Sequence, residues 1–172
     1  VSYGPEAAPL VYHHLDDAGQ ISTSVVMAVD AGRVGVYLRV PQGDDALVFT
    51  ASQDTGVLSY WQENTQGAWG HATEIDLGGD LGARTSTDLA HVNAHGHDWV
   101  ASLSATDHSI SLLRITEDGD VHLADRLDYQ DGLPISTPTV VEVATVGGQT
   151  YLSMAAAGSS SLTTLRLEPS GD

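Results

Sequence analysis

The sequence predicts an all-β protein built from repeated units of about 50 residues, and three observations support this prediction. Residues 100–119 match residues 152–171 at a shift of 52. The match places Arg166 opposite Arg114. Short runs of apolar residues alternate with polar ones between clusters of Gly, Pro, Asn and Asp, whereas helical periodicity is almost absent. Glycines also recur at intervals of 48, 52 and 52, at Gly19, Gly67, Gly119 and Gly171.

These patterns predict a series of short strands separated by turns. In chain order, the predicted strands are residues 10–15, 21–29, 35–40, 46–50, 57–62, 68–77, 87–94, 99–105, 108–116, 120–127, 138–146, 150–156 and 161–167.

The first third of the chain shows alternating strands joined by turn residues. Residues 10–15 (LVYHHL) alternate in polarity, and the valines of residues 21–29 favour a strand over a weak helical pattern. Residues 41–45 (PQGDD) predict a hairpin turn. Pro41 cannot donate a hydrogen bond to a sheet, and Gly43 permits a positive φ.

The middle of the chain contains the most buried predicted strand. Residues 46–50 (ALVFT) are apolar on both faces, which is typical of a strand covered on both sides. Turns are expected at Thr55–Gly56 and at Gly67. Residues 78–82 (GGDLG) read as a loop between units rather than as a domain linker.

The last part of the chain repeats this order of strands and turns. Residues 99–105, 108–116 and 120–127 correspond to the strands of the unit before them. Residues 138–146 end in Gly147–Gly148, which predicts a tight hairpin into the next strand.

A unit of about 50 residues with four short strands is the pattern of a propeller blade. We therefore expect a single domain, residues 1–172, forming a β-propeller-like array of about three and a half four-stranded blades. A β-sandwich is the alternative. The expected units cover approximately residues 1–45, 46–97, 98–148 and 149–172.

The repeat pattern resembles the lactonase-like β-propeller repeats found in large secreted bacterial proteins that also carry calcium-binding nonapeptide repeats. The likeness lies in residues 110–119 and 162–171, each with a leucine-rich strand, an arginine and a closing glycine, and in the hairpin at residues 143–152. It implies a propeller fold in an extracytoplasmic protein. The nonapeptide G-G-x-G-x-D is not present in this sequence, so its calcium site is not implied.

About three and a half blades leave strands without neighbours at both ends of the array. The expected solutions are a fragment of a longer propeller, an open structure, or closure by self-association. About fourteen strands from each of two copies would make seven four-stranded blades, so a homodimer that completes a propeller is one specific hypothesis.

The composition bounds the function classes. The chain has 23 acidic residues against six Lys and Arg, all of them arginine, for a net charge of −17. Such a chain disfavours nucleic acid and anionic membranes as partners. No apolar run approaches the roughly 20 residues of a membrane helix, and no signal peptide is visible. The absence of cysteine excludes disulfides and thiolate chemistry. Acidity of this kind suits salty or calcium-rich surroundings, so we expect secretion or another extracytoplasmic location.

Two groups of side chains are candidate metal ligands. The segment AHVNAHGHDW supplies His91, His95, His97 and Asp98, whose imidazoles and carboxylate could meet one zinc or nickel ion around a hairpin. Asp118 and Asp120, beside Gly119, are candidate calcium ligands because calcium takes oxygens from flexible loops. The competing interpretation is that the histidines are packing or solvent-facing residues and that the aspartates are turn residues.

Other catalytic patterns are absent. No G-x-S-x-G sequence occurs, and Ser159–Ser161 reads as a polar turn. No glycine-rich loop precedes a predicted helix, as a phosphate site requires. Arg114 and Arg166 recur at one repeat position, which indicates a structural role. Trp61, Trp69 and Trp99 are expected to pack between blades, with carbohydrate stacking as the lesser alternative.

The leading hypothesis is a non-enzymatic, extracytoplasmic propeller-like module for interaction or adhesion, tuned by calcium. Its expected partner is a protein or glycan surface, or the remainder of a longer chain. The competing hypothesis is a hydrolase, a lactonase-like or glycan-processing propeller with a metal-assisted site on its axis. No organic cofactor is expected.

Overall fold

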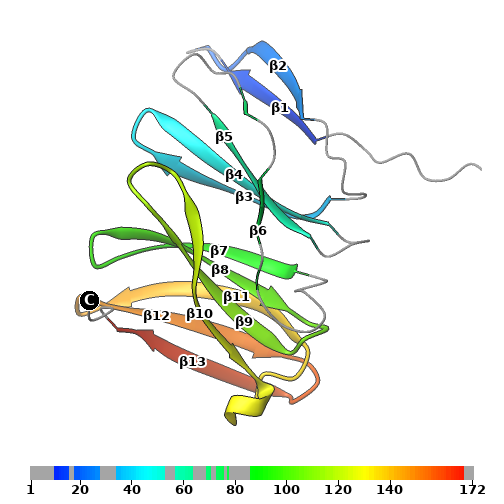
Figure 1. Cartoon of the computed structure of the whole chain (residues 1–172), viewed down its shortest axis with the longest axis vertical. Helices are drawn as coiled ribbons and strands as arrows, with labels where there is room; N and C mark the ends of the chain where they lie inside the picture. The colour runs from blue at the N-terminus through cyan, green and yellow to red at the C-terminus, as the bar shows by residue number, and fades with distance from the viewer. Residues whose placement is uncertain are drawn as a thin grey trace, which may run out of the picture.

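The computed structural model describes residues 10–15, 18–27, 34–52, 57–63, 69–70, 73–75, 77 and 86–168. Within these residues the protein is all-β: thirteen strands form four antiparallel sheets, accompanied by one short 3-10 turn. Figure 1 shows the four sheets one below another, in the order in which they occur along the chain. The prediction of an all-β protein with repeated strands is confirmed. None of the helical segments in the described part of the chain is long and apolar enough to cross a membrane.

The first and second sheets come from the N-terminal half. The first sheet has two strands, β1 (Leu10–Leu15) and β2 (Ile21–Met27). The second sheet contains, in spatial order, β3 (Val34–Gln42), β4 (Asp45–Ser52), β5 (Leu58–Glu63) and β6 (Thr73–Ile75).

The third and fourth sheets come from the C-terminal half. The third sheet contains β7 (Ser86–Ala94), β8 (His97–Ser104), β9 (Ser109–Ile115) and β10 (Val121–Asp128). A 3-10 turn, η1 (Tyr129–Asp131), follows β10. The fourth sheet has three strands, β11 (Pro138–Val146), β12 (Gln149–Ala156) and β13 (Ser161–Leu167).

Strands that are consecutive in the chain pair with each other in every sheet. The β11–β12 hairpin turns at Gly147 and Gly148, both with positive φ, as a two-residue type I′ turn requires. The β7–β8 hairpin turns at His95 and Gly96 in the same way. His95 and Gly147 are 52 residues apart, so the repeat in the sequence is also a repeat in backbone conformation.

The structure corrects the predicted turn at residues 41–45. Strand β3 continues through Pro41, which pairs with Ala46, and the turn lies at Gly43 and Asp44. Pro41 is tolerated because β3 is the edge strand of its sheet. The predicted turns at residues 55–56 and 67 and the loop at residues 78–82 lie outside the described residues.

The repeat units of the sequence are offset from the sheets. The unit at residues 46–97 contains β4 to β6 of the second sheet and then β7, the first strand of the third. The unit at residues 98–148 likewise ends with β11, the first strand of the fourth sheet. Each repeat unit therefore crosses from one sheet to the next.

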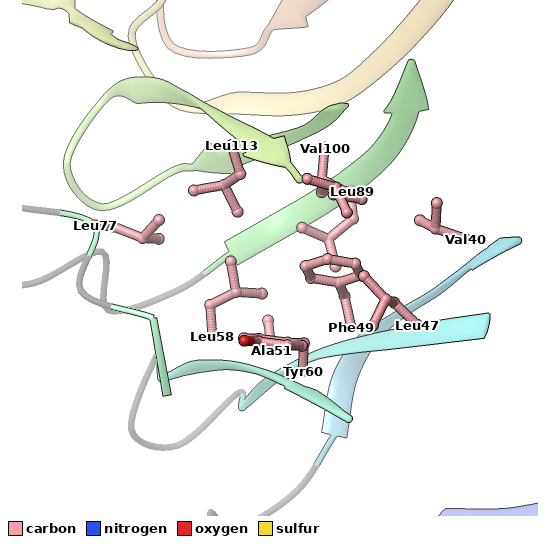
Figure 2. Close-up of a cluster of buried hydrophobic side chains, with 11 residues drawn as sticks. Val40, Leu47, Phe49, Ala51, Leu58, Tyr60, Leu77, Leu89, Val100 and Leu113 are labelled. Carbon is pink, nitrogen blue, oxygen red and sulfur yellow. The ribbon is translucent and has the colours of Figure 1, made fainter. Parts of the chain in front are cut away.

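The second and third sheets pack face to face through one apolar core, drawn in Figure 2. From the second sheet come Leu47, Phe49 and Tyr60, with the Phe49 and Tyr60 rings stacked at 5.9 Å between centroids. Val100 and Leu113 face them from the third sheet. Four of these side chains are fully buried: Leu47, Phe49, Val100 and Leu113. Removing their apolar surface from water stabilises the contact between the two sheets.

A second apolar core joins the third and fourth sheets. Trp99, Leu103 and Ile110 of the third sheet pack with Leu152 and Met154 of the fourth. The third sheet is therefore covered on both faces, because β7 also contacts β3 on one side and β11 on the other.

The outer face of the fourth sheet is more polar than the matching face of the third. Ser153 and Thr164 share a hydrogen bond of 3.1 Å at the positions that Ala101 and Leu112 occupy one repeat earlier. Leu162, whose counterpart is the buried Ile110, is 75% exposed on that face.

Candidate functional site

A groove of about 370 Å³ opens between the third and fourth sheets, and it is the candidate functional site. Its wall on one side is β10 and on the other β13, with residues of β8, β9 and β12 as its floor. The side chains that line it are mostly apolar: Trp99, Ile110, Leu112, Ala124, Leu127, Leu152, Leu165 and Leu167, together with Asp125, Arg126, Arg166 and Glu168. A concave apolar surface with a few polar groups at its margin is typical of a binding site.

The groove lies where the fourth sheet is one strand narrower than the third. In the core between the second and third sheets, β10, the last strand of the third sheet in chain order, contributes Val121, which packs against the buried residues. Arg126 of β10 also donates from Nη1 to the carbonyl oxygen of Leu77 at 3.2 Å. Among the described residues, no strand of the fourth sheet takes the position that β10 has in the third, and the groove lies there.

Strand β13 has one paired edge and one open edge within the described structure. It pairs with β12 from Thr150↔Leu167 to Ala156↔Ser161. Its counterpart one repeat earlier, β9, pairs with strands on both sides, β8 and β10. Within the described residues, the backbone N–H and C=O groups on the other edge of β13 pair with no strand.

Charged side chains stand at the margin of the groove. Arg126 lies 3.6 Å from Asp107, measured from Nη2 to Oδ2, and Arg166 forms an ion pair with Glu168. Asp125 is exposed, and its carboxylate accepts a hydrogen bond from the backbone N–H of Arg126 at 2.8 Å. Both arginines thus already have acidic partners.

Trp99 is the only aromatic side chain among the residues that line the groove. Its indole Nε1–H donates to the carbonyl of Ala94 at 3.3 Å, which fixes the ring. The guanidinium of Arg114 lies 5.8 Å from the ring centroid, and His97 meets the ring edge-on at 6.3 Å. Arg114 also contacts His97, with 3.1 Å between Nη2 and Nε2. The predicted packing role of Trp99 is confirmed.

His95 connects the turn of the third sheet to the end of β13. Its Nε2 lies 3.1 Å from the carbonyl oxygen of Leu167, and because a carbonyl can only accept, Nε2 carries the proton. His95 adopts a φ of 54°, a conformation that costs a non-glycine residue free energy. His95 lies in the β7–β8 turn, whereas His97 is the first residue of β8.

A polar cluster around Asp98, close to the β7–β8 turn, joins the second sheet to the third. Asp98 accepts hydrogen bonds from His91 Nε2 at 2.8 Å, from Asn93 Nδ2 at 2.9 Å and from Gln42 Nε2 at 3.2 Å. Partial burial acts to raise the pKa of Asp98. The hydrogen bonds from Asn93, His91 and Gln42 and the charge of His91 outweigh it and hold that pKa below its ordinary value.

The structure places the predicted metal ligands in separate interactions. His91 and Asp98 meet, but His95 binds Leu167 and His97 binds Arg114. In the described part of the chain, no three His, Asp or Glu side chains are grouped so that they could hold one metal ion.

Asp118 and Asp120 lie in the exposed β9–β10 turn. The backbone N–H of Asp120 donates to Thr116 Oγ1 at 3.1 Å, and Thr116 N–H donates to the carbonyl of Asp120 at 2.9 Å. Both contacts serve the turn itself, and calcium binding at these carboxylates stays a prediction.

The polar turn predicted at residues 159–161 has a structural role. Ser159 Oγ donates to the carbonyl of Pro134 at 2.7 Å, and Ser161 Oγ contacts the same oxygen. These bonds hold the β12–β13 turn against the segment before β11.

Sequence reasoning missed the groove itself. Its leucines follow the ordinary alternation of core strands, so nothing in the pattern separates Leu165 and Leu167 from other core residues. The available signal was the repeat, because it equates Leu165 and Leu167 with Leu113 and Ile115, which pair with the additional strand β10.

No protein-family model matches this chain, and no curated protein matches it, so its function is inferred from the groove and its surroundings.

Proposed function

We propose that this protein is a non-enzymatic interaction module that binds an extended segment of a partner protein in the groove between its third and fourth sheets. The observation that carries this proposal is that an apolar groove of about 370 Å³ adjoins the open edge of β13. The groove supplies apolar area, and the edge supplies directional hydrogen-bonding groups.

The proposed architecture is a propeller-like array in which each sheet acts as one blade. Sheets that follow each other in sequence, pack face to face and repeat at 52 residues support it. A β-sandwich arrangement is also compatible with antiparallel sheets of three and four strands. The resemblance to lactonase-like repeats remains a prediction, and a ring-closing homodimer would compete with the partner segment for the edge of β13.

The proposed setting is extracytoplasmic, with calcium as a modulator. The net charge of −17 supports a protein that works in ion-rich surroundings, because salt screens the repulsion between its carboxylates. Exposed turn carboxylates such as Asp118 and Asp120 are where calcium would act.

The competing hypothesis, a lactonase-like or glycan-processing hydrolase, has less support. Such an enzyme needs a metal or a nucleophile beside a base. Among the described residues, His91 is a base oriented by an acid, because it hydrogen-bonds to the carboxylate of Asp98. This contact orients the imidazole but supplies no nucleophile. We therefore place the function in binding.

A matched pair of tryptophan variants tests the proposal. Ala124→Trp fills the groove, whereas Ala144→Trp adds the same side chain to an exposed position of β11 outside the groove. The wild-type chain would be screened against a random peptide library on phage and against a glycan array.

We expect peptides that bind the wild type and the Ala144→Trp variant and lose at least tenfold in affinity on Ala124→Trp, about 1.4 kcal/mol. Peptide binding that both variants retain would place the site elsewhere. Glycan binding alone, or no binding at all, would refute the proposal.

A further inference from the structure

We propose that the partner segment binds as an added β-strand, antiparallel to β13, and that basic residues stand between its apolar ones. This inference rests on the proposed function, because it names the binding mode and the partner chemistry at the same groove.

The internal repeat shows how such a strand fits. Strand β9, which is equivalent to β13 at a shift of 52, pairs antiparallel with β10 through Val121↔Ile115 and Leu123↔Leu113. The residues of β13 at the positions of Leu113 and Ile115 are Leu165 and Leu167, and both line the groove. A strand placed on β13 as β10 is placed on β9 therefore brings apolar side chains beside these leucines.

An open strand edge does not by itself explain why the partner would bind at β13. Strand β10 also stands at the end of its sheet within the described structure. The groove lies beside β13, between it and β10, so a strand on β13 would bury apolar side chains against Leu112 and Leu127 as well as form backbone hydrogen bonds. A strand on the outer edge of β10 would gain only the hydrogen bonds, whose net contribution in water is small.

The charge balance selects a basic partner rather than a second copy. Two copies of a chain with a net charge of −17 repel each other over the Debye length, about 10 Å at 0.1 M salt. At the groove, Arg126 and Arg166 already contact Asp107 and Glu168, and the carboxylate of Asp125 remains exposed. Lysine or arginine in the incoming strand complements both the local and the overall charge.

Strand β10 itself provides the probe. The aspartate peptide is a nine-residue copy of residues 120–128 (DVHLADRLD), which keeps the apolar pattern that fits β9. The lysine peptide has the same sequence with Asp120→Lys, Asp125→Lys and Asp128→Lys. Binding of each to the full chain would be measured by calorimetry at low and at physiological salt. We expect the lysine peptide to bind at least tenfold more tightly at low salt and to lose this advantage as salt is raised. It should not bind the Ala124→Trp variant.

A pair of N-methylated peptides tests strand addition. A strand on one edge uses the N–H groups of alternate residues, so methylating one alternate set of the lysine peptide should abolish binding and methylating the other set should not. Bound peptide should also slow amide hydrogen exchange in residues 161–167. If both methylated peptides bind and residues 161–167 gain no protection, strand addition is refuted, while loss of binding on Ala124→Trp would still support the groove function.

Three further outcomes are decisive. Equal binding of the aspartate and lysine peptides refutes the basic partner. Protection of β13 in the peptide-free chain that grows with protein concentration, together with a dimer by light scattering, assigns the edge to a second copy and overturns the inference. Failure of both peptides, when library peptides do bind in the groove, overturns strand addition alone.

Discussion

Nε2 of His91 lies 2.8 Å from Oδ1 of Asp98, so the carboxylate at the start of β8 accepts a hydrogen bond from the neighbouring strand β7. Asn93 is the second donor from β7, and Gln42 reaches the other carboxylate oxygen from β3 of the second sheet. One partly buried anion thus ties the second sheet to the third at the end of their shared core.

Replacing Asp98 should destabilise the fold. Asp98→Ala removes the acceptor for three side-chain donors, and we expect the free energy of unfolding to fall by about 1 to 2 kcal/mol. Asp118→Ala is the control, because Asp118 is exposed in the β9–β10 turn. Urea denaturation of both variants measures the difference, and equal effects would show that the Asp98 cluster contributes nothing.

The same carboxylate makes stability depend on pH in a definite direction. The pKa of Asp98 is lower in the folded chain than its ordinary value, so its contribution is complete above the unfolded pKa of about 3.9. It is lost as the pH falls through the folded pKa, where the protonated carboxyl no longer accepts the same bonds. The stability difference between the wild type and Asp98→Asn should therefore shrink as the pH falls below about 4, and a constant difference would contradict the assignment.

Two neighbouring threonines of β13 should respond oppositely to valine. Thr163 Oγ1 is buried without a hydrogen-bond partner in the described structure, whereas Thr164 bonds to Ser153 on the exposed face. Thr163→Val should stabilise the fold by about 1 kcal/mol because it removes an unsatisfied hydroxyl. Thr164→Val should be neutral or slightly destabilising. A loss of stability for Thr163→Val in thermal denaturation would show that the hydroxyl has a partner.

Gly119 should tolerate alanine less well than Gly148. Both have positive φ, which costs a non-glycine residue about 1 kcal/mol. A Cβ at Gly119 would also come within 2.7 Å of Gln62 Nε2, while a Cβ at Gly148 would meet open space. The extra loss for Gly119→Ala should be small, since the glutamine side chain can move, and it should disappear when combined with Gln62→Ala. Urea titrations of the three variants test this, and an extra loss that persists without Gln62 would point to backbone strain alone.

Calcium should raise the melting temperature more than its ionic strength explains. We expect a shift in low-salt buffer with millimolar calcium that exceeds the shift with sodium chloride at equal ionic strength. Asp118→Asn combined with Asp120→Asn should remove the excess if these carboxylates hold the ion. Identical shifts with calcium and sodium would indicate general screening only.

The strands were predictable because their signals are local. Residues 138–146 and 161–167 were predicted with the bounds that β11 and β13 have, since alternation and turn glycines act within a few residues. Pro41 was misplaced because its tolerance in β3 depends on that strand being at an edge, which is a property of the sheet.

The site was not predictable in the same way. The groove depends on the spacing between β10 and β13, which are not paired with each other, and on the width of the fourth sheet. His95 shows what the repeat could have revealed, because Gly147 stands at its position one unit later and marks it as a turn residue. The pairing of His91 with Asp98 follows from the short β7–β8 turn, which brings Asn93 opposite Asp98.

The pairing of each strand with its neighbour in the chain bears on how the protein forms during synthesis. All strand contacts within a sheet close over short stretches of sequence, so each sheet can assemble soon after its last strand leaves the ribosome. The second and third sheets can be packed together before β11 is translated. Strands β12 and β13 are translated after this, and they join a body that is already folded.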